Sequence, residues 1–253
     1  SANWVTNLAG TATSIQTPTS VDLVVLSASN ALPSNKLGMT LGADISVLGV
    51  SVVTDSAVGV ANTGDYVLSV GSYGISMASG ASDASFASRI QLDASQTWTN
   101  AGAGVLTVSG SVVTAGYTLE IAGSGNTSVS GTISGTGSLS KAGTGALMLM
   151  GANTYSGSTT VSGGRVTAET GAFGSTSSIT VSGGSLDAVD FDGSAPLVVL
   201  SGGSARFTGG SLNIISAANS GRLEFAPSGG VLSIGSLSGA DSGVTTFNGN
   251  AEV

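Results

Sequence analysis

The sequence predicts an all-β fold and, within that class, a β-solenoid in which short strands stack coil upon coil. Glycine supplies 40 of the 253 residues and interrupts almost every stretch of ten, which costs a helix about 1 kcal/mol at each interior position. Short runs of alternating apolar and polar residues recur along the chain and end in glycine-containing turns. Several of these turns recur at intervals close to twenty residues, which is the range of one solenoid coil.

The composition excludes several classes of protein. An apolar fraction of 41% with only 8% charged residues is unlike a disordered chain, so we expect the protein to fold. The absence of Cys and His removes disulfide scaffolds, Cys-based zinc sites and the commonest general base. A formal net charge of -8, with scattered basic residues, predicts no binding to nucleic acid or to an anionic membrane. No apolar run reaches the roughly 18 residues of a transmembrane helix, so no membrane-spanning segment is predicted.

The N-terminal part, 1–100, is expected to form a less regular β portion that is continuous with the solenoid. Strand patterns occur there at 21–26 and 45–48, with wider spacing than further along the chain. No charged or proline-rich linker separates this part from 101–253, so the sequence predicts a single elongated domain. The chain opens at Ser1 without an initiator Met or an export signal, and we therefore expect a processed or excised piece of a longer protein.

Regular β-solenoid coils are predicted for 101–253. Ser-Gly-Gly begins at positions 162, 182 and 201, and the related triplets that begin at 208 and 228 repeat the same interval. Glycine suits a solenoid corner because it permits a tight turn and a close approach of neighbouring coils. The second residue after each glycine pair is apolar and is expected to point inward. The predicted core positions are Leu106, Val108, Leu119, Ile121, Leu139, Leu147, Leu149, Val161, Ile179, Val181, Leu186, Leu212 and Ile214.

The most informative stretch of the sequence is 135–166. From 135 to 161, every second residue belongs to a set that includes the large apolar side chains, the glycines and one Asn. This period of two continues for longer than two strands, and it places Leu139 and Leu147 toward the core. Asn153 is expected to hydrogen-bond neighbouring backbone at a turn.

The pattern over 135–166 resembles the passenger-associated transport repeat, also called the autotransporter-associated β-strand repeat. The segments 41–44 and 96–100 also resemble the leader that precedes this repeat in very large bacterial surface proteins. The resemblance implies a right-handed parallel β-helix that is exported to the bacterial cell surface or into the extracellular space. It implies no enzymatic activity and no cofactor.

The densest acidic cluster lies at 187–193 and supplies candidate metal ligands. On a strand, Asp190 and Asp192 would project to the same side, as a cation with oxygen ligands such as calcium requires. Asp187 is the third candidate ligand. The cluster lacks the bidentate Glu and the regular spacing of an EF-hand loop, and an ordinary solvated turn is therefore the alternative interpretation.

The sequence favours a structural function and leaves two alternatives open. In the favoured interpretation the chain is a rigid surface stalk, fibre, filament subunit or biofilm matrix component. It would pair head to tail or laterally with identical copies, or with the rest of a longer solenoid. The first alternative is an adhesin or a glycan-binding passenger. The second is a polysaccharide-active enzyme, for which Asp190 and Asp192 are the sensible carboxylate pair. We expect no enzyme activity and assign no catalytic residue.

Overall fold

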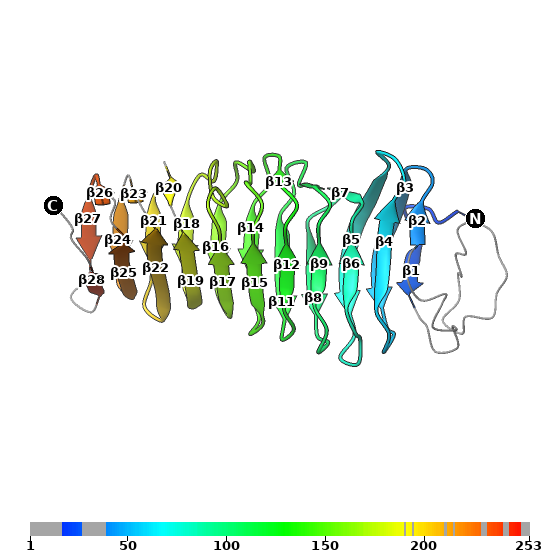
Figure 1. The fold of residues 1–253 in the computed structure, drawn as a ribbon, viewed down its shortest axis with the longest axis horizontal. Helices are drawn as coiled ribbons and strands as arrows, with labels where there is room; N and C mark the ends of the chain where they lie inside the picture. The colour runs from blue at the N-terminus through cyan, green and yellow to red at the C-terminus, as the bar shows by residue number, and fades with distance from the viewer. Residues whose placement is uncertain are drawn as a thin grey trace.

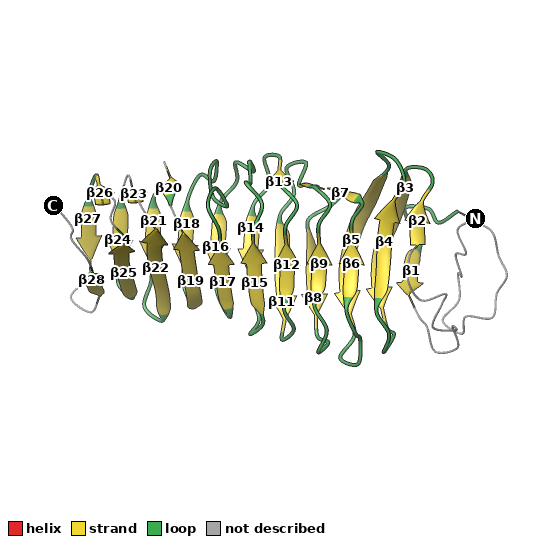
Figure 2. Cartoon of the chain, viewed as in Figure 1, coloured by secondary structure: helices red, strands yellow, loops and turns green. Residues whose placement is uncertain are grey.

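The computed structural model shows a parallel β-solenoid. It describes residues 17–26, 39–189, 191–193, 195–209, 212–214, 216–228, 232–239 and 243–248. Within these ranges every helix or strand assignment is a β-strand, and all strand pairs are parallel, which confirms the predicted fold class (Figure 2). The coils stack along one axis into an elongated rod, from the blue N-terminal end to the red C-terminal end (Figure 1).

Each coil has three faces, and the first face is an eleven-stranded sheet to which successive coils contribute one strand each. We call this sheet face I. Its strands, in order along the rod, are β2 (Met39–Leu41), β4 (Val58–Asn62), β6 (Ala84–Phe86), β9 (Leu106–Val108), β12 (Thr127–Val129), β15 (Ala146–Leu149), β17 (Arg165–Ala168), β19 (Gly184–Val189), β22 (Gly203–Gly209), β25 (Arg222–Pro227) and β28 (Val244–Phe247).

Face II follows face I along the chain in each coil. The long strands β3 (Ile45–Val52) and β5 (Val67–Met77) begin on this face and continue onto the third. The shorter strands of face II are β7 (Arg89–Leu92), β10 (Val112–Val113), β13 (Ile133–Ser134), β20 (Asp192–Gly193), β23 (Leu212–Ile214) and β26 (Leu232–Ile234). The last three form a separate three-stranded sheet, because no strand of the described chain occupies face II between β13 and β20.

Face III completes each coil. The long strands β3 and β5 connect it to β7, β10 and β13 of face II, so that these strands and face III form one 14-stranded sheet. Its remaining strands are β1 (Leu23–Leu26), β8 (Gln96–Asn100), β11 (Leu119–Gly123), β14 (Leu139–Lys141), β16 (Thr159–Val161), β18 (Ile179–Val181), β21 (Leu197–Val199), β24 (Ala217–Asn219) and β27 (Leu237–Gly239).

The strand register of face I confirms the coil length predicted from the glycine pairs. Arg165 pairs with Ser185, and Ser185 pairs with Ser204, so one turn of the rod takes as many residues as separate successive glycine pairs. Gly184 begins β19 with a φ of +69°, at the corner where the chain enters face I. Gly209 ends β22 at the other end of face I. The glycine pairs that follow Ser162, Ser182 and Ser201 therefore mark one corner of the coil, and the pair that begins at Gly209 marks another.

Coils nearer the N-terminus are longer. On face I, Val58 pairs with Ala84 and Ala84 pairs with Leu106, and both separations in sequence exceed the one between Arg165 and Ser185. The pairing of β3 with β5 also contains a register shift between Val47 and Gly49. Strands β3 to β8 nevertheless belong to the same two large sheets as the later coils.

Apolar side chains that alternate inward along the strands fill the interior of the rod. The predicted core positions are buried throughout, except that the side chain of Leu212 lies outside the described residues. The largest apolar side chains that are completely buried are Trp98, Phe86, Phe207 and Phe225. In the part of the chain that the structure describes, no helix has the length and hydrophobicity needed to cross a lipid bilayer.

Candidate functional site

Asn153 connects three consecutive coils from the interior of the rod. It lies on the side of the coil where face II has no strand, and it is buried. Its Oδ1 accepts a 2.8 Å hydrogen bond from the backbone N–H of Ile133 in the preceding coil, and its Nδ2 donates to the Ala172 carbonyl in the following coil at 3.0 Å. The predicted hydrogen bonding of Asn153 to neighbouring backbone is therefore confirmed.

A buried chain of hydroxyl groups lies next to Asn153. The Tyr155 hydroxyl is 2.6 Å from Thr159 Oγ1, which is 3.1 Å from Thr176 Oγ1. Thr176 Oγ1 in turn donates to the carbonyl of Gly157 at 2.8 Å. Burial raises the pKa of Tyr155 to about 12, so the phenol stays protonated at neutral pH and acts as a structural hydrogen-bonding group.

Lys141 is an inward-pointing lysine on β14. It occupies a column between Ile121 and Val161, and the residue is only 2% exposed. Its Nζ donates to the carbonyls of Ala142 and Gly143 at the corner after β14, and no carboxylate of the described chain lies within ion-pair distance. Burial lowers the pKa of the Lys141 ammonium. The two-residue period includes this position in the inward set, but the sequence assigns it no function.

The structure gives Asp187 an ion-pair partner. Asp187 lies on β19, and its Oδ2 is 2.8 Å from Arg165 Nη2 on the adjacent strand β17. Asp190 lies outside the described residues, and so does the side chain of Asp192. The structure therefore describes only one of the three predicted calcium ligands, and the calcium site stays a prediction. Within the described residues no group of three or more acidic side chains could hold a metal ion.

The ion pair of Asp187 belongs to a row of charges on the outer surface of face I. Arg206 on β22 lies 3.3 Å from a carboxylate oxygen of Glu224 on β25, and Arg222 lies 3.7 Å from the other. The arginine side chains are half-exposed or more, so each pair contributes no more than about 1 kcal/mol to stability. These pairs leave the three arginines of face I already partnered.

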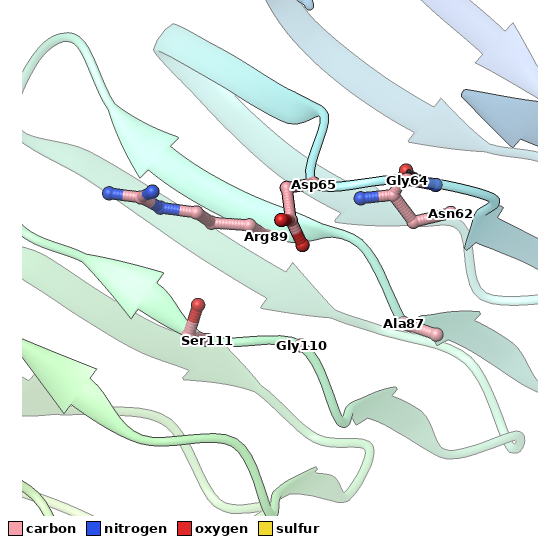
Figure 3. Close-up of a pocket in the computed structure, with 7 residues that line it drawn as sticks. All are labelled: Asn62, Gly64, Asp65, Ala87, Arg89, Gly110 and Ser111. Atoms are coloured by element: carbon pink, nitrogen blue, oxygen red, sulfur yellow. Dashed lines mark hydrogen bonds between the residues drawn. The ribbon is translucent and has the colours of Figure 1, made fainter. Parts of the chain in front are cut away.

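A polar cleft lies at the corners between face I and face II, where three successive coils meet (Figure 3). It has a volume of about 480 Å³. The residues that line it are Asn62, Gly64, Asp65, Ala87, Arg89, Gly110 and Ser111. Sequence reasoning missed this cleft, because its residues belong to different coils. Which of them become neighbours depends on the exact number of residues in each coil.

Two opposite charges lie in the cleft without pairing with each other. Arg89 begins β7 and Asp65 lies in the turn before β5, and both residues are exposed. No ion pair within 4.0 Å joins either charge to another described residue. The turn that carries Asp65 is held by Asn62, whose Nδ2 donates to the Tyr66 carbonyl at 2.7 Å and whose Oδ1 accepts the N–H of Gly64 at 3.2 Å.

One family model matches a part of the chain. Residues 139–168 match the family model of the passenger-associated transport repeat, which confirms the resemblance seen at 135–166. The chain matches no curated protein and no solved structure. Together, the repeat and the parallel solenoid indicate a surface β-helix like an autotransporter passenger, and the repeat family indicates a location at the cell surface or outside the cell.

Proposed function

Because a passenger-associated transport repeat lies within this parallel solenoid, we propose that the chain is a structural protein of the bacterial surface or the extracellular matrix. It acts as a rigid rod that extends by head-to-tail pairing with identical copies. Rigidity comes from the strand ladders, which connect each coil to its neighbours along the rod (Figure 1). The observation that carries the proposal is the transport repeat within a continuous stack of parallel strands.

The last described coil has unpaired strand edges and exposed apolar side chains. Among the described residues, β26, β27 and β28 each pair with a strand on one side only. Leu237 is 45% exposed, Val244 57% and Phe247 42%. Phe247 stacks on Phe225 at 5.6 Å and ends a row of phenylalanines that begins inside the rod. Such an edge is a template for a further strand and a further aromatic ring, which either a second copy or the rest of a longer solenoid would supply.

The first strands match this edge in their order around the coil. β1 lies on face III and β2 on face I, and within the described chain each is paired on one side only. A second copy that continues the rod would place β1 beside β27 and β2 beside β28, with all strands still parallel. This contact joins two different surfaces and does not close on itself, so it produces a filament.

Sedimentation and negative-stain electron microscopy of the purified chain over a range of concentrations test this assembly. We expect fibres that lengthen with concentration, and we expect Phe247→Glu to shift the chain to single rods because it buries a charge at each joint. Tyr117→Glu, at an exposed position on the side of the rod, is the matched control and should leave the fibres intact. Single rods at every concentration, or fibres equally sensitive to both variants, would contradict head-to-tail pairing.

Glycan binding is a second candidate function, and the polar cleft around Arg89 favours it. An adhesin or passenger of this kind would use a site on the side of the rod, which stays accessible whether or not the ends are paired. Screening the chain on a glycan array tests this function. Reproducible binding to one class of glycan supports it, and a blank array contradicts it.

We also propose that the chain works without a catalytic residue or a cofactor. Asp187, one of the three calcium candidates, already neutralises Arg165. Titration calorimetry with calcium should therefore show no saturable binding, and polysaccharides should not be cleaved. Turnover that is lost in an Asp190→Asn variant would instead establish an enzyme.

A further inference from the structure

We propose that the cleft between Asn62 and Ser111 binds an acidic sugar, with Arg89 holding the carboxylate and Asp65 accepting hydrogen bonds from the ring hydroxyls. The proposal gives a ligand class to the glycan-binding function suggested above and is independent of head-to-tail assembly. It begins from the surroundings of Arg89, which differ from those of the other described basic residues.

Arg89 is the exposed cation of the described chain that no carboxylate neutralises. Arg165, Arg206 and Arg222 each have an acidic partner on face I, and Lys141 is buried with carbonyl groups. A free guanidinium presents a planar fork of N–H donors that fits a carboxylate with two parallel hydrogen bonds. Arg89 is therefore free to bind one carboxylate.

The remainder of the cleft supplies hydrogen-bonding groups for the hydroxyls of a ligand, and it repels a ligand with additional negative charge. The Asp65 carboxylate has no hydrogen-bond or ion-pair partner in the described chain, and the exposed Ser111 provides a hydroxyl (Figure 3). A carboxylate accepts hydrogen bonds from neighbouring sugar hydroxyls, but it repels a ligand with two or more negative charges. The net charge of -8 has the same effect at longer range. A hexuronic acid unit satisfies both conditions.

Hydrogen bonds fix the backbone of the segments that carry Asp65, Arg89 and Ser111. Ser111 lies beside Arg89 across the face II ladder, because the N–H of Ile90 donates to the Ser111 carbonyl at 2.8 Å. Gly110 makes this close packing possible, since a Cβ there would overlap the Ser88 carbonyl oxygen. Asn62 is a positioning residue for Asp65 through its two hydrogen bonds to the turn. A volume of about 480 Å³ is within the range of small-molecule sites.

The openness of the cleft favours a sugar of a polysaccharide over a free amino acid. Because Arg89 and Asp65 are both exposed, each ion pair to a small zwitterion would be screened by water and would contribute little. A polysaccharide adds contacts from neighbouring rings along the side of the rod, and these contacts compensate for the weak binding of one unit.

Binding is tested by calorimetry with a neutral oligosaccharide that carries a single glucuronic acid unit, using the full chain. The methyl-esterified oligomer is the matched ligand, because it keeps the rings and removes the charge. Arg89→Gln should weaken binding of the free acid by about two- to fivefold. Arg165→Gln, which removes an equal charge from face I, should leave that affinity unchanged. Thermal unfolding of both variants controls for the fold.

A second variant tests the role of Asp65. Acetate and the oligosaccharide with one glucuronic acid carry the same charge, so Asp65→Ala changes the repulsion equally for both. Because the variant also removes the acceptor for the ring hydroxyls, it should reduce the preference for the sugar over acetate. The proposal is overturned by any of four results: no binding of the free acid at millimolar concentration, equal binding of the ester, equal losses in Arg89→Gln and Arg165→Gln, or tighter binding of free alanine. Fibre formation by the same preparations is scored separately, so a failure of one proposal is distinguishable from a failure of the other.

Discussion

The Oδ1 of Asn153 and the backbone N–H of Ile133 form a 2.8 Å hydrogen bond between adjacent coils. Face II has no strand there, and the side chain adds to the few backbone hydrogen bonds between the coils, such as the one from the Thr154 N–H to the Ile133 carbonyl at 2.8 Å. The amide is suited to this position because it accepts from the coil before and donates to the carbonyl of Ala172 in the coil after.

Replacing this amide should destabilise the rod locally. Asn153→Ala leaves a buried N–H on one side and a buried carbonyl on the other, and we expect a loss of about 2–4 kcal/mol in the free energy of unfolding. Urea unfolding measures the loss, and hydrogen exchange should show faster exchange of the Ile133 amide. Asn248→Ala, at an exposed position, is the control and should cost less than about 0.5 kcal/mol. Equal losses in the two variants would refute this role.

Lys141 should make stability depend on pH. Burial lowers the pKa of its ammonium from the ordinary value of 10.5, so the unfolded chain binds this proton more tightly than the folded chain. The free energy of unfolding should therefore rise as the pH rises from the folded-state pKa toward 10.5. Lys141→Met removes this contribution and should be at least as stable as wild type at pH 7. The carbonyls of Ala142 and Gly143, which lose the Lys141 ammonium as a donor, can bind water instead, because Ala142 is half-buried and Gly143 is exposed.

The difference between the unfolding curves of wild type and Lys141→Met isolates this effect. Tyr155 titrates in the opposite sense: its pKa is raised to about 12, so its contribution to stability is lost above the unfolded-state value near 10. That contribution is common to both proteins and cancels in the difference. A difference that does not change between pH 7 and pH 10 would show that Lys141 is hydrated in the folded state.

Truncation of two neighbouring residues of β15 should change the free energy of unfolding by very different amounts. Leu149 is completely buried, and Leu149→Ala should cost about 2–5 kcal/mol through lost burial and a residual cavity. Met148, one position earlier, is 44% exposed, and Met148→Ala should change the free energy of unfolding by less than about 0.5 kcal/mol. Thermal or urea unfolding compares the two variants, and a larger effect at Met148 would place the strand in the wrong register.

The corner glycines should differ in their tolerance of alanine. At Gly184, with a φ of +69°, a Cβ would overlap the Gly164 carbonyl oxygen, so Gly184→Ala should cost about 2 kcal/mol or more. At Gly80 a Cβ would meet no atom within 4 Å, and Gly80→Ala should be neutral or stabilise by up to about 1 kcal/mol. Melting temperatures of the two variants test this contrast, which fails if Gly184→Ala is tolerated as well as Gly80→Ala.

Interior features were predictable from sequence because they follow a local period. The two-residue alternation placed Leu149 inside, and the glycine pairs marked the coil length that the pairing of Arg165 with Ser185 shows. Surface neighbours were not predictable, because they depend on the exact length of every coil. Arg165 and Asp187 belong to different coils and meet only in the stacked structure.

The candidate cleft shows the same limit more strongly. Asp65, Arg89 and Ser111 come from three successive coils, and on face I the coil from Val58 to Ala84 is longer than the coil from Ala84 to Leu106. A shift of a residue or two in any of these coils would separate the three side chains. One signal in the sequence could have pointed to Arg89. It is a basic residue with no acidic residue at the matching position about one coil length away.

Cryo-electron microscopy of the assembled chain tests head-to-tail pairing most directly. We expect fibres in which the strand spacing of about 4.7–4.9 Å continues without interruption across each joint. At the joint, β27 of one copy should lie beside β1 of the next, and β28 beside β2. Fibres made of rods packed side by side, or joints at which the spacing is broken, would contradict head-to-tail pairing.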